Sequence, residues 1–373
     1  MNITIERAAL LRSLSHVQSV VERRATIPIL SNVLLRAKDD FLSLAATDMD
    51  LEIIEAAPAN VKNAGGITAP AHTLFDIVRK LPDGSEVQLE TSADGGSMTL
   101  RSGRSTFRLP CLPVEDFPQL SGGEFKVRFD IAAATLRKLI DRSRFAISTE
   151  ETRYYLNGIY LHAANTSGAG PTLRAVATDG HRLARVEAPL PDGAEHMPGV
   201  ILPRKTVGEV RKLIDEAADL VQVSLSETKV RFQIDTVTVT SKLIDGSFPD
   251  YERVIPSGND KLLLVRPKEF AAAVDRVATI STEKSRAVKM ALGKNIITVS
   301  ANSPEAGQAS DELEGKYDGP ALEIGFNSRY LLDIVQQIEN EEAAFFMADA
   351  AAPTIIKDGG DDSALYVLMP MRV

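Results

Sequence analysis

The sequence predicts an α+β protein built from three copies of one domain, each copy with two helices and antiparallel strands. Three observations predict this fold. Strand-then-helix segments recur along the chain, and alternating apolar and polar residues mark strands between them. A length of 373 residues with 44% hydrophobic and 25% charged side chains suits two or three folded domains. The repeat favours three.

One strand-then-helix segment occurs three times without gaps, at 67–81, 200–214 and 324–338. In each copy, apolar residues recur four, seven and eleven positions after the helix start, which places them on one buried stripe. The starts are Pro70, Pro203 and Asn327, and the stripes are Leu74, Ile77 and Leu81; Val207, Val210 and Ile214; and Leu331, Ile334 and Ile338. Proline suits the first helical position, where its missing N–H costs nothing, and asparagine suits a cap.

A second strand-then-helix segment precedes each of these, at 2–21, 126–147 and 262–280. Its apolar stripes are Leu10, Leu14, Val17 and Val21; Leu136, Leu139 and Ile140; and Phe270, Val274 and Val277. The chain is therefore expected to hold six strand–helix units, two per domain. The repeat predicts domains at 1–127, 128–260 and 261–373.

Alternating runs between the helices predict half-buried antiparallel strands. Examples are 221–226, 230–234, 237–243 and 296–300, with Gly-rich hairpin turns at 92–97, 165–171 and 357–363. Repeated units that present strands at both ends of a chain leave unpaired edges, which a closed symmetric oligomer removes. A gene duplication without geometric consequence is the alternative, and the repeat alone leaves it open.

Composition excludes several classes of protein. The single cysteine, Cys111, cannot form an internal disulfide, and Glu6 and Arg7 stand where a signal peptide would carry an apolar run. No run reaches the about 18 apolar residues of a membrane span, because Asp349 and Pro353 interrupt the most apolar segment. A reducing, cytoplasmic location is expected.

The net charge of −9 argues against bulk attraction of the whole surface to nucleic acid. However, the six predicted helical segments together carry +6, and the rest of the chain carries −15. Helices that share one surface would make that surface basic and attractive to phosphates. The alternative is that Arg and Lys serve here as helix formers on solvated faces.

Motifs for catalysis are missing from the sequence. It has no phosphate-binding loop of the G-x-x-x-x-G-K-[ST] type, and its five histidines lack metal-ligand spacing. One segment, ATDGHRLA at 177–184, places Asp179 and His181 two apart, as a general-base pair or as an Asp-Gly turn with a structural histidine. We therefore expect a protein that is not an enzyme and that needs no metal or cofactor, with a hydrolase as the alternative.

Two further segments are unusual for a plain scaffold. The connector SFPDYERVIP at 247–256 carries Phe248, Pro249 and Tyr251, and the chain ends in the apolar segment LYVLMPMRV. Chain ends are usually polar and frayed. A tail with Met369 and Met371 suits an adaptable groove for partner peptides, and an ordinary last strand of a sheet is the alternative.

Taken together, these segments resemble the family of the bacterial DNA polymerase III β subunit, the sliding clamps. The resemblance rests on an ordered set of motifs: SNVLL (31–35), ATDMDLEI (46–53), RSGRSTFRL (101–109), RYYLNGIYL (153–161), ATDGHRLA (177–184), TSKLIDGSFPDYERV (240–254), IGFNSRYLLDIV (324–335) and the terminal YVLMPMRV. No single motif is decisive, but the set covers nearly the whole chain.

The resemblance implies three clamp domains per chain and a head-to-tail homodimer. Two such chains would form a ring around duplex DNA, with twelve helices lining the hole and continuous sheets outside. The interface residues that it implies are Phe107 and Leu109 on one edge and Thr279 and Ile280 on the other. Arg24, Tyr154 and Tyr155 match positions near the duplex.

The resemblance also implies a groove that binds partner peptides. It maps to Leu156, Thr178, Gly180, His181, Arg182, Leu183, Pro249, Arg253, Val254, Asn327, Tyr330, Val367, Met369, Pro370, Met371 and Arg372. Such a groove is an apolar slot for Leu and Phe side chains, with His181, Arg182, Asn327 and Arg372 as polar anchors at its rim. Val373 and Ser285 depart from residues common in relatives.

The function that follows is topological. A closed ring slides along DNA without reading sequence and holds a bound polymerase near its primer end, which gives processivity. The implied partners are duplex DNA, a second copy of the chain, the polymerase III catalytic subunit, an ATP-dependent clamp loader, and other polymerases and repair proteins with clamp-binding peptides. A repeat scaffold without a nucleic-acid role is a further alternative.

Overall fold

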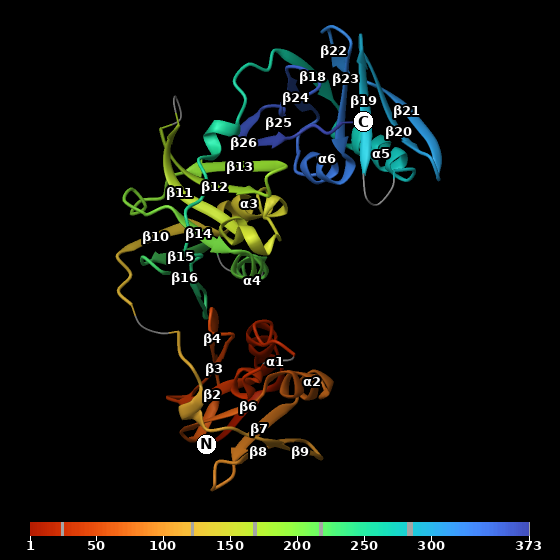
Figure 1. Ribbon diagram of the computed structural model, residues 1–373. Helices are drawn as coiled ribbons and strands as arrows, with labels where there is room; N and C mark the ends of the chain where they lie inside the picture. The colour runs from red at the N-terminus through yellow and green to blue at the C-terminus, as the bar shows by residue number, and fades with distance from the viewer. Residues whose placement is uncertain (24–25, 121–122, 167–169, 216–218, 282–285, 373) are drawn as a thin grey trace. The chain divides into compact units, whose positions relative to one another are not determined.

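The computed structural model describes residues 1–373 except 24–25, 121–122, 167–169, 216–218, 282–285 and 373 (Figure 1). The chain divides into two compact units. The first holds residues 1–137, 191–197 and 205–243, and the second holds 138–190, 198–204 and 244–373. Each unit is described separately below.

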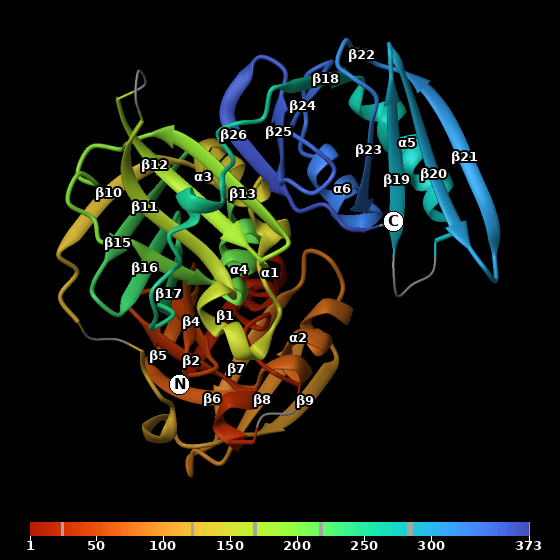
Figure 2. The same cartoon turned by 45° about the horizontal axis from the view of Figure 1, so that its top comes forward.

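Six α-helices occur in the described residues, and each begins within two residues of the end of a strand. They are α1 (Arg7–Val17), α2 (Ala71–Lys80), α3 (Ala133–Asp141), α4 (Arg204–Asp215), α5 (Pro267–Ala278) and α6 (Ser328–Val335). The prediction of six strand–helix units is confirmed. Figures 1 and 2 show α1 beside α2 and α5 beside α6, and the members of each pair are in contact.

The helix starts differ from the prediction at the two prolines. Pro70 is the N-cap of α2, and Pro203 is the last residue of a strand, so neither occupies the first helical position. Both still precede a helix without needing to donate an N–H. The Asn327 cap is confirmed, because its side-chain oxygen accepts the N–H groups of Arg329 at 3.0 Å and Tyr330 at 3.3 Å.

The predicted apolar stripes are buried with one exception. Ile77 is partly exposed, and its neighbour Val78 is fully buried in its place. Leu81 and Ile338 are buried but lie just beyond the ends of α2 and α6. The predicted helical period is confirmed, and α1, α2 and α6 end before the last residue of their stripes.

Two antiparallel sheets form the first unit. The five-stranded sheet has the order β5 (Asn60–Asn63), β1 (Asn2–Glu6), β7 (Glu86–Thr91), β8 (Ser97–Ser102), β9 (Ser105–Pro110). The eight-stranded sheet has the order β10 (Val127–Ala132), β15 (Leu220–Leu225), β16 (Lys229–Ile234), β17 (Val237–Lys242), β4 (Leu51–Pro58), β3 (Phe41–Thr47), β2 (Asn32–Lys38), β6 (Gly65–Pro70).

The second unit also contains two antiparallel sheets. The nine-stranded sheet has the order β14 (Val200–Pro203), β11 (Gly158–Thr166), β12 (Gly170–Thr178), β13 (Arg182–Pro189), β26 (Asp361–Leu368), β25 (Thr354–Asp358), β24 (Ala343–Met347), β18 (Lys261–Val265), β22 (Lys316–Tyr317). The four-stranded sheet has the order β21 (Gly307–Glu314), β20 (Ile296–Ser303), β19 (Ala287–Gly293), β23 (Leu322–Asn327).

Short 3₁₀ helices complete the connections. They are η1 (Pro28–Ser31), η2 (Val114–Asp116), η3 (Arg144–Ala146), η4 (Glu151–Leu156) and η5 (Tyr251–Val254). Each unit contains one pairing between strands of different predicted domains, β4 with β17 in the first and β13 with β26 in the second. The described residues include no helix that is both long and apolar enough to cross a membrane.

An ionic network around the buried guanidinium of Arg142 joins the end of α3 to the hairpin of β25 and β26. The Arg142 guanidinium is 4% exposed and pairs with Asp361 and Glu339, each at 2.8 Å, and Lys138 reaches Asp361 at 3.1 Å. Burial raises the pKa of Asp361, but bonds from Ser363, Arg142 and Lys138 outweigh it and lower that pKa overall. The ionised carboxylate therefore stabilises the fold.

This network predicts a pH-dependent effect of Asp361→Asn. We expect a loss of about 1 kcal/mol in the free energy of unfolding at neutral pH, after allowance for solvent screening. Because the folded pKa lies below the unfolded value of about 3.9, the difference from wild type is full above that pH and shrinks below it. Denaturant titrations of both proteins from pH 7 to pH 3 measure it. A difference that grows toward acid would contradict the assignment.

Candidate functional site

The segment ATDGHRLA forms a tight turn between β12 and β13. Asp179 Oδ1 accepts the backbone N–H groups of His181 at 2.9 Å and Arg182 at 3.0 Å. Thr178 Oγ1 accepts the N–H of Gly180 at 3.1 Å, and Gly180 has φ +89°, a value that glycine adopts without strain. The side chains of the motif therefore build the turn itself.

This geometry favours the turn over a general-base pair. The second oxygen of Asp179, Oδ2, accepts Nε of Arg182 at 3.1 Å. The His181 ring stacks on Tyr330, with ring centroids 6.1 Å apart and planes 23° apart. Asp179 thus accepts hydrogen bonds from the backbone and from Arg182, and His181 packs on an aromatic ring.

A cavity of about 330 Å³ opens beside this turn. Its walls come from η4, the β12–β13 turn, the connector 248–254 and the end of β26. The residues that line it are Arg153, Tyr155, Leu156, Thr178, Gly180, His181, Arg182, Leu183, Pro249, Asp250, Tyr251, Val254, Val367 and Met369. Leu156, Leu183 and Val367 are buried, so their side chains give the cavity an apolar floor. It suits apolar side chains of an extended peptide.

The connector is held in place by its aromatic residues. Phe248 stacks on Tyr160 with ring centroids 4.9 Å apart and planes 8° apart. The Tyr251 hydroxyl accepts Nη1 of Arg174 at 3.0 Å and lies 3.0 Å from Nε2 of His162. Burial raises the pKa of Tyr251 and lowers that of His162, so both stay neutral at pH 7. These anchors fix the wall that carries Pro249 and Val254.

The C-terminal tail extends past β26 as a bonded segment. The N–H of Met369 donates to the carbonyl of His181 at 2.9 Å, and the N–H of Met371 donates to that of Gly325 at 2.8 Å. The Met369 side chain is 42% exposed at the cavity. The tail therefore continues from the last strand of the sheet and forms part of the cavity wall.

The structure brings ten of the sixteen predicted groove residues to this cavity. The other six, which are not among the lining residues, are Arg253, Asn327, Tyr330, Pro370, Met371 and Arg372. Tyr330 contacts His181 and Arg182, Asn327 caps α6, and Arg253 pairs with Asp250 at 2.8 Å. Ser285 and Val373 lie outside the described residues.

Arg182 differs from its predicted position at the rim. Its side chain is only 8% exposed, and all three guanidinium nitrogens have acceptors inside the protein. The reason is the acidic and aromatic surroundings of β13, which hold the guanidinium inside.

Four lining residues were missed by the sequence analysis. They are Arg153, Tyr155, Asp250 and Tyr251. Asp250 and Tyr251 stand between Pro249 and Val254 in the connector, so a continuous wall could have been predicted there. Tyr155 directly precedes Leu156 but was expected to face DNA.

The residues expected near DNA have different surroundings. Arg24 lies outside the described residues. Tyr154 is 54% exposed on η4, and its ring meets the Tyr155 ring edge-on with centroids 5.8 Å apart. Tyr154 is therefore available for a ligand, whereas Tyr155 already contributes to the cavity.

The residues expected at the dimer interface lie near two strand edges. Phe107 is partly exposed and Leu109 is buried on β9, which ends the five-stranded sheet. Thr279 and Ile280 follow α5, which packs on β21, the edge of the four-stranded sheet. Exposed Arg104 and Arg108 flank Phe107, whereas Glu312 and Glu314 are exposed on β21. The two edges thus carry opposite charge, a signal that was readable in the sequence but missed.

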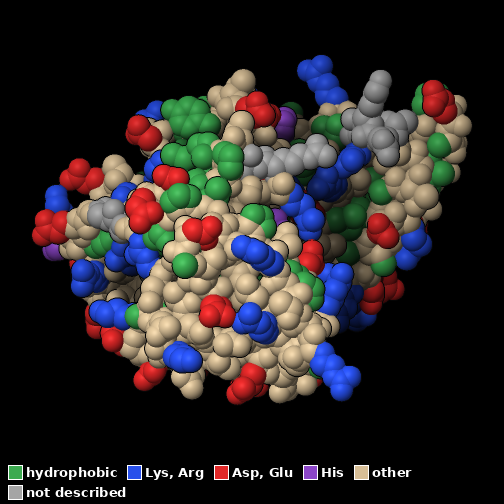
Figure 3. Space-filling model, turned by 90° about the horizontal axis from the view of Figure 1, so that it is seen from below, with side chains coloured by type: hydrophobic (Ala, Val, Ile, Leu, Met, Phe, Trp, Pro, Cys, Tyr) green, Lys and Arg blue, Asp and Glu red, His purple; other side chains and the backbone are tan. Residues whose placement is uncertain are grey.

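Much of the positive charge on the helices is locally paired. Ion pairs join helical cations to Asp83, Asp76, Asp215, Asp361, Asp48, Glu209 and Asp311. On the face in Figure 3, Lys and Arg side chains are interspersed with Asp and Glu. Nearby carboxylates therefore neutralise part of the helical surplus of cations.

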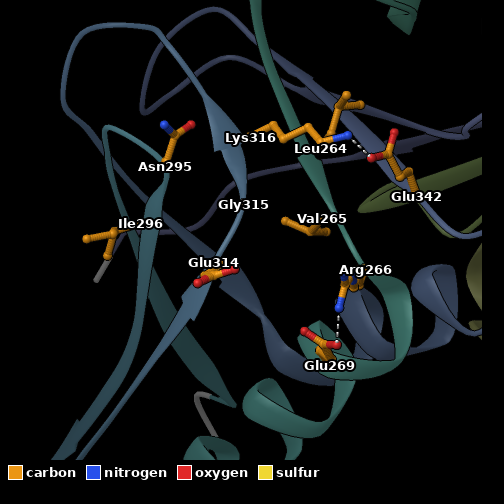
Figure 4. A pocket seen from close by; sticks show the side chains of 10 residues that line it. All are labelled: Leu264, Val265, Arg266, Glu269, Asn295, Ile296, Glu314, Gly315, Lys316 and Glu342. Carbon is orange, nitrogen blue, oxygen red and sulfur yellow. Dashed lines mark hydrogen bonds and ion pairs between the residues drawn. The ribbon is translucent and has the colours of Figure 1, made fainter.

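A second cavity, of about 320 Å³, lies where β18 and β22 diverge from β20 and β21 (Figure 4). Its two cations are engaged by carboxylates, Arg266 with Glu269 at 3.0 Å and Lys316 with Glu342. Strands β19 and β23 pair from Ala287 opposite Asn327 to Leu292 opposite Leu322. This second cavity lies near the Leu292 end of the pair, away from Asn327. Its walls are more charged than those of the first cavity, so it suits apolar side chains less well. In the described part of the chain, no group of His, Cys, Asp or Glu could hold a metal ion.

Comparison with known proteins gives matches along the whole chain. Three family models match in tandem: the N-terminal domain of the DNA polymerase III beta subunit at residues 1–121, the central domain at 130–250 and the C-terminal domain at 252–372. The Beta sliding clamp of Caulobacter vibrioides is 56% identical over 373 residues, and that of Escherichia coli K12 is 38% identical over 376, each with 100% of both chains covered.

A solved structure gives the same result. The DnaN sliding clamp of Bartonella birtlesii bound to griselimycin matches with a TM-score of 0.96 and 52% identity, covering 100% of both chains.

Proposed function

Because the chain belongs to the family of the DNA polymerase III β subunit, the β sliding clamps, we propose that it is a DNA sliding clamp. It is a non-catalytic processivity factor built from three clamp domains. The observation that carries this function is the tandem match of three domain models over nearly every residue. The apolar cavity beside the β12–β13 turn supports it, because a tether needs a site for its cargo.

The cavity beside the β12–β13 turn is the site proposed for partner peptides. Leu156, Leu183 and Val367 would receive Leu and Phe side chains, and Met369 would repack around different sequences. Arg153 and Asp250 add charge of both signs at its mouth. The same site is our candidate for griselimycin, the ligand named with the Bartonella relative.

The proposed assembly is a head-to-tail homodimer closed into a ring. The β9 edge of one chain would pair with the β21 edge of another, which satisfies both open edges and matches their opposite charges. Phe107 and Leu109 would meet Thr279 and Ile280 there. A dimer would contain two such contacts, each between β9 of one chain and β21 of the other, so two copies close the ring.

Within the ring, duplex DNA is expected to be held by charge without sequence readout. The helices carry the surplus of cations, and Arg24, Tyr154 and Tyr155 are the candidate DNA-facing residues. The domain boundaries that we propose are 1–127, 128–260 and 261–373. The proposed partners are the polymerase III catalytic subunit, an ATP-dependent loader, and other polymerases and repair proteins. The proposed location is the cytoplasm.

His181→Ala separates this function from a hydrolase. We expect the variant to bind a Leu- and Phe-containing peptide about tenfold more weakly, because it loses the ring that stacks on Tyr330. The chain contains no tryptophan, so a Trp placed in the synthetic peptide reports binding by fluorescence. Wild-type hydrolysis of ester or amide substrates that disappears in the variant would support the hydrolase instead.

A further inference from the structure

A turn of the same kind as the β12–β13 turn occurs in the first predicted domain, without the arginine found at Arg182. Segment 46–51 (ATDMDL) repeats segment 177–182 (ATDGHR). In the counterpart, Asp48 Oδ1 accepts the N–H groups of Asp50 at 2.9 Å and Leu51 at 2.7 Å, as Asp179 does for its own turn. Met49 has φ +77° where Gly180 has +89°.

The strand beside each turn is bonded in the same way. The N–H of Lys242 donates to the carbonyl of Asp50 at 2.8 Å, as the N–H of Met369 donates to that of His181 at 2.9 Å. The backbone framework is therefore common to both turns, and any property found at only one of them depends on side chains.

The side chains differ most at the last position of the turn, which is Leu51 in one copy and Arg182 in the other. The Arg182 guanidinium donates from Nε to Asp179 at 3.1 Å, from Nη1 to Asp333 at 2.6 Å, and from Nη2 to the carbonyl of Phe145 at 2.6 Å. It also lies between two rings, 4.3 Å from the Tyr330 centroid and 5.1 Å from that of Phe145. Asp48, in contrast, pairs with Lys205 of α4.

Through these contacts, Arg182 holds neighbouring elements of the fold together. Its three bonds join β13, η3 and α6, and charge-assisted bonds in a buried setting are the stronger kind. The Tyr330 ring that packs on the guanidinium also packs on His181, which lines the cavity. The positions of His181 and Leu183, on either side of Arg182, thus depend on the bonds that Arg182 makes to Asp333 and Phe145.

We propose that Asp333 and Phe145 are positioning residues for the partner groove, which they shape through Arg182 although neither lines it. This inference rests on the proposed function, because it concerns how the same groove recognises peptides.

The test compares two matched acidic residues. Glu209 on α4 occupies the position that Asp333 occupies on α6, six residues after Pro203 and Asn327 respectively, and is bonded to Ser19 and Lys212 rather than to a turn. Full-length wild type, Asp333→Asn and Glu209→Gln are titrated with a synthetic peptide that carries Leu, Phe and a single Trp, and their melting temperatures and dimer state are recorded.

We expect Asp333→Asn to weaken peptide binding about tenfold and Glu209→Gln to leave it within about twofold, because only the first removes a negative charge that is bonded to Arg182. Asp333→Glu, which keeps the charge, should restore most of the affinity. Equal affinity in wild type and Asp333→Asn would overturn the proposal, as would equal losses in the two variants.

Two further outcomes are informative. If Asp333→Asn does not fold, Phe145→Leu removes one ring from the guanidinium and keeps every charge, with an expected loss of about threefold; an unchanged affinity would again overturn the proposal. If wild type itself fails to bind the peptide, the proposed function of the groove is wrong. That result differs from one in which wild type binds and the substitutions at Asp333 and Phe145 have no effect.

Discussion

Deletion of residues 369–373 is expected to weaken binding of a partner peptide by at least about a hundredfold while the dimer persists. The deletion removes the Met369 side chain from the cavity wall and both backbone bonds that hold the tail, from Met369 to His181 and from Met371 to Gly325. The edges proposed for dimerisation, β9 and β21, are not touched.

The matched control for this deletion removes only residue 373. It keeps both backbone bonds and the Met369 side chain, so the affinity should fall by only about twofold or less. Peptide fluorescence measures the affinity, and sedimentation measures the dimer. A monomer after the longer deletion would show that the tail is needed for assembly, and unchanged peptide binding would remove it from the groove.

Charge reversal at either proposed edge is expected to give a monomer, and a mixture of the two variants should restore the dimer. One variant carries Arg104→Glu and Arg108→Glu beside Phe107, and the other carries Glu312→Arg and Glu314→Arg on β21. Each variant alone would place like charges across both contacts of the ring. In the mixed dimer, opposite charges meet at both contacts again.

Sedimentation of each variant and of an equimolar mixture decides this prediction. Lys80→Glu with Arg128→Glu reverses two exposed charges elsewhere and should leave the dimer intact. Raising the salt concentration should narrow the difference between variants, because exposed charges are screened. Monomers that remain monomers on mixing would contradict the pairing of these two edges.

The repeated architecture was predictable because it depends on local periodicity. Leu10, Leu136 and Phe270 lie on helical stripes that are buried in the structure, and Asn327 caps its helix as expected. Helix ends were less predictable, since residues such as Leu81 remain buried after the helix has stopped.

Most residues of the groove were predictable from the sequence, but the contacts that hold Arg182 in place were not. The resemblance marked Arg182 as a groove residue, yet two of its acceptors lie 37 and 151 residues away in sequence. Such distant contacts depend on how β13, η3 and α6 pack, and no local pattern encodes them. The charges of β9 and β21 were visible in the sequence, but their meaning depends on which strands end a sheet.

In the proposed ring, the chain is held on DNA by topology. The most direct measurement loads the protein onto nicked circular DNA with its loader and ATP, isolates the complex, and then cuts the circle once. A closed ring should remain on the intact circle and leave when the cut creates free ends, and bulky proteins bound at both ends should retain it. Protein that stays on linear DNA with free ends would contradict the ring.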